Sequence, residues 1–196
     1  MGVIKTALEI ALEKTENVKS DKSTISQFDA KRKGKKLANA FLAGEAEITD
    51  EIKKTPAADR ESLKQGIFDV LITQIALPIS GEDENKIEKV GKGLSAVLSG
   101  KNSEFSAIIK MLTQLFSQYL QESSHYEQAI RQQYAPKLRK KEEELSRRMG
   151  REVRIDPMQD PEFVTFFNQH MSALKGNYEA AIEQAKENIK GIFNKQ

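Results

Sequence analysis

The fold is decided by residues 108–149, IIKMLTQLFSQYLQESSHYEQAIRQQYAPKLRKKEEELSRRM, in which apolar side chains recur every three or four positions. This spacing gathers them on one face of an α-helix. The same spacing returns over residues 163–193, and a short connector containing Gly150 separates the two stretches. Residues 102–196 are therefore predicted to form a long antiparallel helical hairpin.

Prolines set the expected limits of these two helices. Asp160-Pro161-Glu162 is typical of a helix start, with Asp160 as the N-cap and proline at the first helical position. Pro136 is expected to kink or restart the first helix, because proline removes a backbone donor and clashes with the preceding turn. The only strand candidate, Val153-Arg154-Ile155, is too short to make a sheet.

Residues 1–101 are predicted to form a bundle of about five shorter helices. The polar run 17–23 is expected to end the first of them, and Thr55-Pro56 is expected to start the fourth, with threonine as the N-cap. Residues 63–77 carry apolar side chains on nearly every helical face, which predicts a central core helix. The expected segments are residues 4–15, 24–43, 48–52, 56–77 and 87–98.

The predicted fold class is therefore all-α: a bundle of about five shorter helices followed by a long antiparallel helical hairpin. Residues 1–101 and 102–196 are the expected domains, either separate or packed together as a single domain. A chain of 196 residues is long enough for both arrangements.

The amino-acid composition excludes several classes of site and of function. The chain contains no cysteine, which excludes disulfides, thiolate metal sites and thiol nucleophiles. The most apolar stretch, residues 66–79, is shorter than the roughly 20 residues that a membrane-spanning helix needs. Glu9 and Glu13 interrupt what would be the apolar core of a signal peptide. We therefore expect a cytoplasmic protein with no membrane partner.

No motif specifies catalysis or a metal site. Glu122 and His125 have the Glu-x-x-His spacing of carboxylate-bridged metal bundles, but those bundles need a second copy, and the chain has only one other histidine. Residues 91–96, GKGLSA, match the letters of a dinucleotide fingerprint without the strand that must precede it, so close helix packing explains these glycines better. We expect no catalytic residue, no metal and no cofactor, and favour a protein without enzymatic activity.

Two basic clusters are candidates for binding anions. Residues 31–36 contain five basic side chains, and residues 131–154 contain nine basic and four acidic ones. The interleaved signs favour a solvated surface, in which Lys140 or Lys141 pairs with the acidic run 142–144. Phosphate contacts through these clusters are the alternative. The candidate anion-binding residues are Lys31, Arg32, Lys35, Lys36, Lys140, Arg147 and Arg148.

The last helix carries more apolar side chains than one facing helix is expected to cover. Contiguous exposed apolar surface usually marks a partner site. The candidate interface residues are Phe163, Phe166, Phe167, Met171 and Tyr178.

We therefore predict a non-enzymatic structural or adaptor protein that acts through helix-mediated self-association or partner binding, as a homo-oligomer or with a protein partner. One alternative is nucleic-acid or anionic-surface binding through basic helix faces, which we do not favour. Another alternative is a ligand-binding helical bundle.

Overall fold

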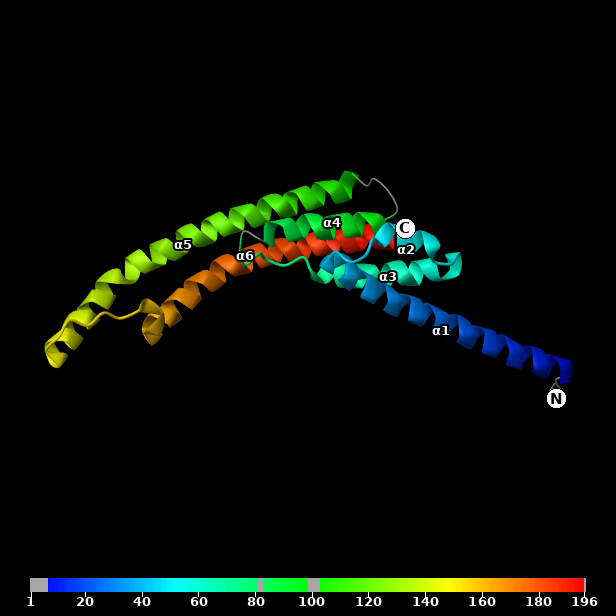
Figure 1. Cartoon of the computed structure of the whole chain (residues 1–196), viewed down its shortest axis with the longest axis horizontal. Helices are drawn as coiled ribbons and strands as arrows, with labels where there is room; N and C mark the ends of the chain where they lie inside the picture. Colours follow the sequence, from blue (N-terminus) through cyan, green and yellow to red (C-terminus); the bar gives the residue numbers. More distant parts are fainter. Residues whose placement is uncertain (1–6, 81–82, 99–102, 196) are drawn as a thin grey trace, which may run out of the picture. The chain divides into compact units, whose positions relative to one another are not determined.

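The computed structural model describes residues 7–80, 83–98 and 103–195, with side chains from residue 24 onward except those of residues 84 and 85. These residues contain six α-helices and no strand (Figure 1), so the predicted all-α class is confirmed. Val153-Arg154-Ile155 lies in an irregular segment. The elements are α1 (Ala7–Ala43), α2 (Ile48–Lys54), α3 (Ala57–Thr73), α4 (Glu84–Val97), α5 (Ser103–Met149), the 3-10 helix η2 (Pro157–Gln159) and α6 (Pro161–Asn194).

The chain divides into two compact units. The first consists of Met1–Ile75 and Lys89–Asn102, and the second of Ala76–Glu88 and Ser103–Gln196. The expected domains 1–101 and 102–196 stay a prediction, as does the arrangement of a bundle followed by a hairpin. None of the described helices combines the length and the apolar character that crossing a bilayer requires.

In the first unit, α1 and α3 touch through their backbones at two glycines. A Cβ atom added to Gly34 would overlap the carbonyl oxygen of Leu63, and one added to Gly66 would overlap that of Lys31. Ser26 donates a hydrogen bond to Asp59 at 2.9 Å, so the start of α3 lies beside the middle of α1. The two helices cross where neither has a side chain to separate them.

Helix α3 contributes more buried apolar side chains to the first unit than any other helix, as predicted for the core helix 63–77. Leu63, Ile67, Phe68, Leu71, Ile72 and Ile75 are all buried. The helix itself ends at Thr73, before the expected limit at residue 77. Gly93 of α4 packs closely against Leu71, Phe41 and Ile48, which confirms the packing interpretation of this glycine.

The prediction that residues 17–23 end a helix is wrong, because α1 runs through them without interruption. This run contains neither glycine nor proline, and polar side chains alone do not interrupt helical hydrogen bonding. The expected end of the segment 24–43 is confirmed, because α1 ends at Ala43. Gly44 has φ +85°, and the N–H groups of Gly44 and Glu45 donate to the carbonyls of Phe41 and Ala40, the pattern of a Schellman motif.

The predicted N-cap at Thr55 is also wrong. Helix α3 begins at Ala57 with Pro56 in the N-cap position, and no side chain caps it. The Thr55 hydroxyl instead donates to the carbonyl oxygen of Glu51 at 2.8 Å. The threonine therefore completes the end of α2, since the same carbonyl oxygen also accepts the Thr55 backbone N–H at 3.2 Å.

In the second unit, α5 and α6 run side by side in opposite directions (Figure 1). Aromatic contacts fix the register, because Tyr119 meets Tyr178 and Tyr134 meets Phe163. Helix α5 continues through Pro136 as a single helix, so the alternative of a restart at this proline is wrong. Tyr134, two residues before the proline, is buried against α6, and such tertiary packing compensates for the lost backbone bond.

Candidate functional site

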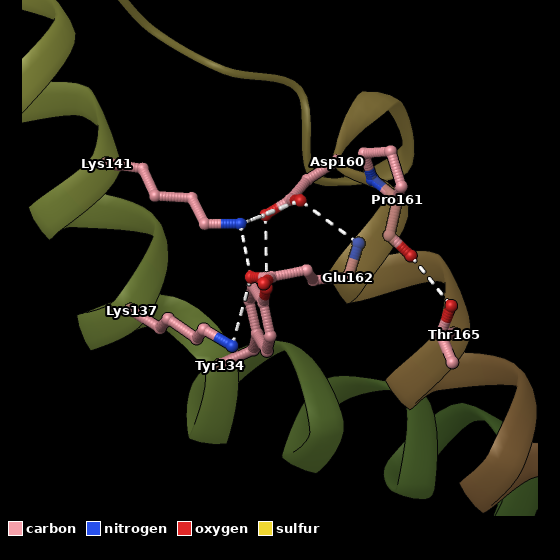
Figure 2. A network of polar contacts seen from close by, with 7 residues as sticks. All are labelled: Tyr134, Lys137, Lys141, Asp160, Pro161, Glu162 and Thr165. Carbon is pink, nitrogen blue, oxygen red and sulfur yellow. Dashed lines mark hydrogen bonds and ion pairs between the residues drawn. The ribbon is translucent and has the colours of Figure 1, made fainter.

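The most organised polar cluster of the second unit surrounds Asp160, at the start of α6. Asp160 caps the helix by accepting a hydrogen bond from the Glu162 backbone N–H at 3.1 Å. Its two carboxylate oxygens also accept from the Lys141 ammonium at 2.9 and 2.8 Å, and one accepts from the Tyr134 hydroxyl at 3.1 Å (Figure 2). The cap residue thus ties the start of α6 to two turns of α5.

A second carboxylate extends this cluster. Glu162 lies 2.6 Å from the Lys141 nitrogen and 3.0 Å from the Lys137 nitrogen, and the Lys137 ammonium also lies over the Tyr134 ring. We call these five residues, Tyr134, Lys137, Lys141, Asp160 and Glu162, the Asp160 network. Within the described residues, no buried side-chain nitrogen or oxygen lacks a hydrogen-bond partner.

The pKa shifts in the Asp160 network fit a structural role better than acid–base catalysis. The hydrogen bond from Lys141 holds the pKa of Asp160 below its ordinary value, and bonds from Lys141 and Lys137 do the same for the pKa of Glu162. The pKa of Lys141 is raised by the same two carboxylates. Burial and the bond to Asp160 raise the pKa of the Tyr134 hydroxyl. All these shifts keep the groups in their neutral-pH protonation states, whereas a general acid or base works best with a pKa near 7.

The predicted interface residues lie along the contact between α5 and α6. Phe163 is buried, and Phe166, Phe167 and Met171 are half-buried around it, together with Ile130 and Tyr134 of α5. One facing helix therefore covers more of this apolar face than the sequence suggested. A partner role for these residues stays a prediction.

Tyr178 continues the same contact further along α6. It meets Tyr119 edge to face, and burial together with a hydrogen bond to Glu122 raises its pKa to about 12. Glu122 is thus a hydrogen-bond acceptor for this tyrosine. Among the described residues, no group of three or more His, Cys, Asp or Glu side chains is placed to hold a metal ion.

The first basic cluster is largely paired within its own unit. Lys31 lies 2.9 Å from Asp69, Arg32 lies 3.2 Å from Asp29, and Lys33 lies 3.3 Å from Glu51. Lys35 and Lys36 are exposed. These ion pairs fit a solvated helix face. Lys31 also joins α1 to α3, and Lys33 joins α1 to α2.

In the second basic cluster, the observed ion pairs differ from those expected along the helix. Lys141 pairs with Asp160 and Glu162, because the connector and α6 bring these carboxylates onto α5, and the expected pairing of Lys141 with the run 142–144 is wrong. Glu142 instead accepts the Ile155 backbone N–H at 2.9 Å. A second bond, from the Val153 N–H to the Ser146 hydroxyl at 2.8 Å, also fixes the connector to α5.

Exposed apolar and basic side chains gather around this fixed connector. We call the region formed by residues 137–162 the turn region. Met149 and Met158 are 53% and 48% exposed. A pocket of about 290 Å³ in the turn region is lined by residues that include Leu145, Arg148, Ile155 and Pro161. Sequence reasoning identified Arg147 and Arg148 as basic but missed the methionines and the pocket, which depend on the path of the connector.

One protein-family model matches more than half of the chain. A family model described as "Family of unknown function (DUF6657)" matches residues 49–191. The chain belongs to the DUF6657 family. The matched residues extend from α2 into the last turns of α6, and so include the whole Asp160 network and the turn region. No curated protein and no solved structure matches the chain.

Proposed function

We propose that this member of the DUF6657 family is a non-enzymatic adaptor that works through helix-mediated association, and that two copies associate through α1. The observation that carries the proposal is the exposure of two large apolar side chains on one helix. Ile25 is 62% exposed and Phe28 is 70% exposed. Their spacing of three residues puts them on the same face of α1.

The position of these side chains in the first unit supports a helical partner. Because α3 begins at Ala57 and meets α1 near Ser26, α1 extends beyond the start of α3 towards its N-terminus (Figure 1). In the sequence, Ala11 and Val18 precede Ile25 by two heptads and one heptad. Apolar residues repeated at this interval favour packing against another helix.

The hypothesis of nucleic-acid binding through residues 31–36 receives less support. Three of its five cations already have carboxylate partners at 3.3 Å or less. Non-specific affinity for nucleic acid grows with the number of phosphates that free cations neutralise. We therefore rank this alternative below association.

Replacing Ile25 and Phe28 together with glutamate is expected to convert an oligomer into a monomer. Two carboxylates on the associating face would have to be buried without partners. The measurement is the mass in solution by light scattering after size exclusion, at micromolar concentration. The matched control is Gln27→Glu, which adds a carboxylate at another exposed position of the same helix and is expected to leave the mass unchanged. A native chain that is already monomeric would contradict self-association.

A further inference from the structure

The turn region holds cations that have no carboxylate partner in the described part of the chain. The acidic side chains closest in sequence are partly engaged, since Glu142 accepts a backbone N–H and Glu152 pairs with Arg154. The described structure shows no cation partner for Glu143, Glu144 or Asp156, and Asp156 accepts the Met158 backbone N–H. The unpaired cations are Arg139, Lys140, Arg147, Arg148 and Arg151.

Apolar side chains lie among these cations. Met149 and Met158 are about half exposed, and Leu145 is 36% exposed. The pocket of about 290 Å³ is lined by three apolar residues, Leu145, Ile155 and Pro161, and by the polar or charged residues Lys141, Glu144, Arg148, Gln159 and Asp160. Arginine and methionine are enriched in protein interfaces, and methionine adapts its shape to a partner.

We propose that the turn region is a docking surface for an acidic, amphipathic segment of a partner protein. An apolar side chain of that segment enters the pocket between Leu145, Ile155 and Pro161, while its carboxylates pair with Arg147, Arg148 and Arg151. This inference rests on the partner-binding part of the proposed function and adds the chemistry of the partner.

Charge and shape favour a protein segment over the other anionic partners. A pocket of about 290 Å³ suits a single inserted side chain, whereas a bilayer presents a continuous surface. Glu143 and Glu144 would repel the phosphates of a nucleic acid, which recur at a fixed spacing, whereas a short peptide can carry its carboxylates only at the positions opposite Arg147, Arg148 and Arg151. Single-stranded nucleic acid would also require exposed aromatic side chains for base stacking, and residues 137–162 contain no aromatic residue.

The surface is also held in shape before a partner arrives. The Asp160 network joins α5 to the start of α6, and the bonds from Val153 to Ser146 and from Ile155 to Glu142 hold the connector against α5. A surface fixed in this way loses little conformational entropy on binding.

The experiment selects ligands from a displayed library of random 12-residue peptides on the full chain. Selected peptides are expected to be rich in aspartate and glutamate and to contain a large apolar residue. Fluorescence anisotropy with a selected peptide then compares the native chain with Arg148→Glu and with the combined Arg147→Glu, Arg148→Glu and Arg151→Glu variant. We expect at least tenfold weaker binding for each, and weaker native binding at high salt.

Control variants distinguish binding at the turn region from a general effect of charge on peptide binding. Lys110→Glu reverses an exposed charge elsewhere on α5 and is expected to change the affinity less than twofold. The milder Arg148→Gln variant, checked by circular dichroism, covers the case in which the triple variant does not fold. Selection without acidic enrichment, or equal binding by the triple variant, overturns the proposal.

Two further probes test the other anionic partners. Binding of phosphatidylserine vesicles or of double-stranded DNA through the same arginines, with no peptide bound, also overturns the proposal. The outcome of the peptide-binding experiment is independent of the outcome of the light-scattering experiment on self-association. An oligomer that ignores acidic peptides refutes only this inference, and a monomer that binds them refutes only the association through α1.

Discussion

Gly34→Ala and Gly66→Ala are each expected to lower the free energy of unfolding of the first unit by about 3 kcal/mol, the upper end of the usual cost of overpacking. In each variant the new Cβ would lie within 3.0 Å of a backbone carbonyl oxygen of the neighbouring helix. Backbone atoms cannot rotate away as a side chain can. Relief therefore requires α1 and α3 to move apart along their whole contact.

Replacing a third helical glycine with alanine is expected to raise the free energy of unfolding. This contrast makes a loss of stability at Gly34 and Gly66 specific to the close helix crossing. Gly176 is exposed in the interior of α6 and would have no neighbour within 4 Å of its new Cβ. Alanine is favoured over glycine inside a helix by about 1 kcal/mol, so Gly176→Ala is expected to stabilise the chain. Urea unfolding followed by circular dichroism measures all three variants. Stabilisation by Gly34→Ala would contradict the close crossing of α1 and α3.

Periodicity predicted where helices form better than where they begin and end. The apolar face from residue 108 onward and the all-round apolar character of residues 63–77 correspond to α5 and the core of α3, because burial selects side chains along whole helices. The prediction of a helix end at residues 17–23 is wrong because low hydrophobicity alone does not end a helix. The chain continues as a helix there since no residue in the run breaks the backbone pattern.

Sequence reasoning found single residues of the site but not their partners. Asp160-Pro161-Glu162 predicted a helix cap correctly, and Asp160 does cap α6. The pairing of Asp160 with Lys141 joins residues on different elements, and no spacing along one helix encodes that contact. The same holds for Gly34, whose role depends on the backbone of α3 lying against it. Contacts between elements follow from packing, and one sequence contains no direct signal of it.

Asp160→Ala is expected to cost more stability than any other single change in the Asp160 network. The loss of the N-cap alone costs about 0.5–2 kcal/mol, and the substitution also removes the carboxylate that pairs with Lys141 and accepts from the Tyr134 hydroxyl. Asp160 is only 6% exposed, so water cannot easily replace it. The measurement is the free energy of unfolding from urea titrations near pH 7.

Asp160→Asn separates the two roles of this residue, because asparagine caps helices as well as aspartate does but carries no charge. It is expected to keep the cap and lose the ion pair, giving a stability between those of the native chain and Asp160→Ala. Lys141→Met is the matched change on the other partner and is expected to cost a similar amount. A loss with Asp160→Asn as large as that with Asp160→Ala would assign the whole effect to charge.

The pH dependence of the difference between the native chain and Asp160→Asn tests the charge directly. The pKa of Asp160 is lowered in the folded chain from its ordinary value of 3.8, chiefly by the bond from Lys141, so the ion pair stabilises the fold above that pH and is lost as the pH falls through the folded value. The pKa of Lys141 is raised from 10.5, so its contribution is complete below that pH and is lost only as the pH rises through its own folded value. The stability difference is therefore expected to be constant between about pH 5 and pH 9 and to shrink towards pH 2. A difference that persists undiminished in acid would show that the shape of the Asp160 side chain, and not its charge, holds α6 against α5.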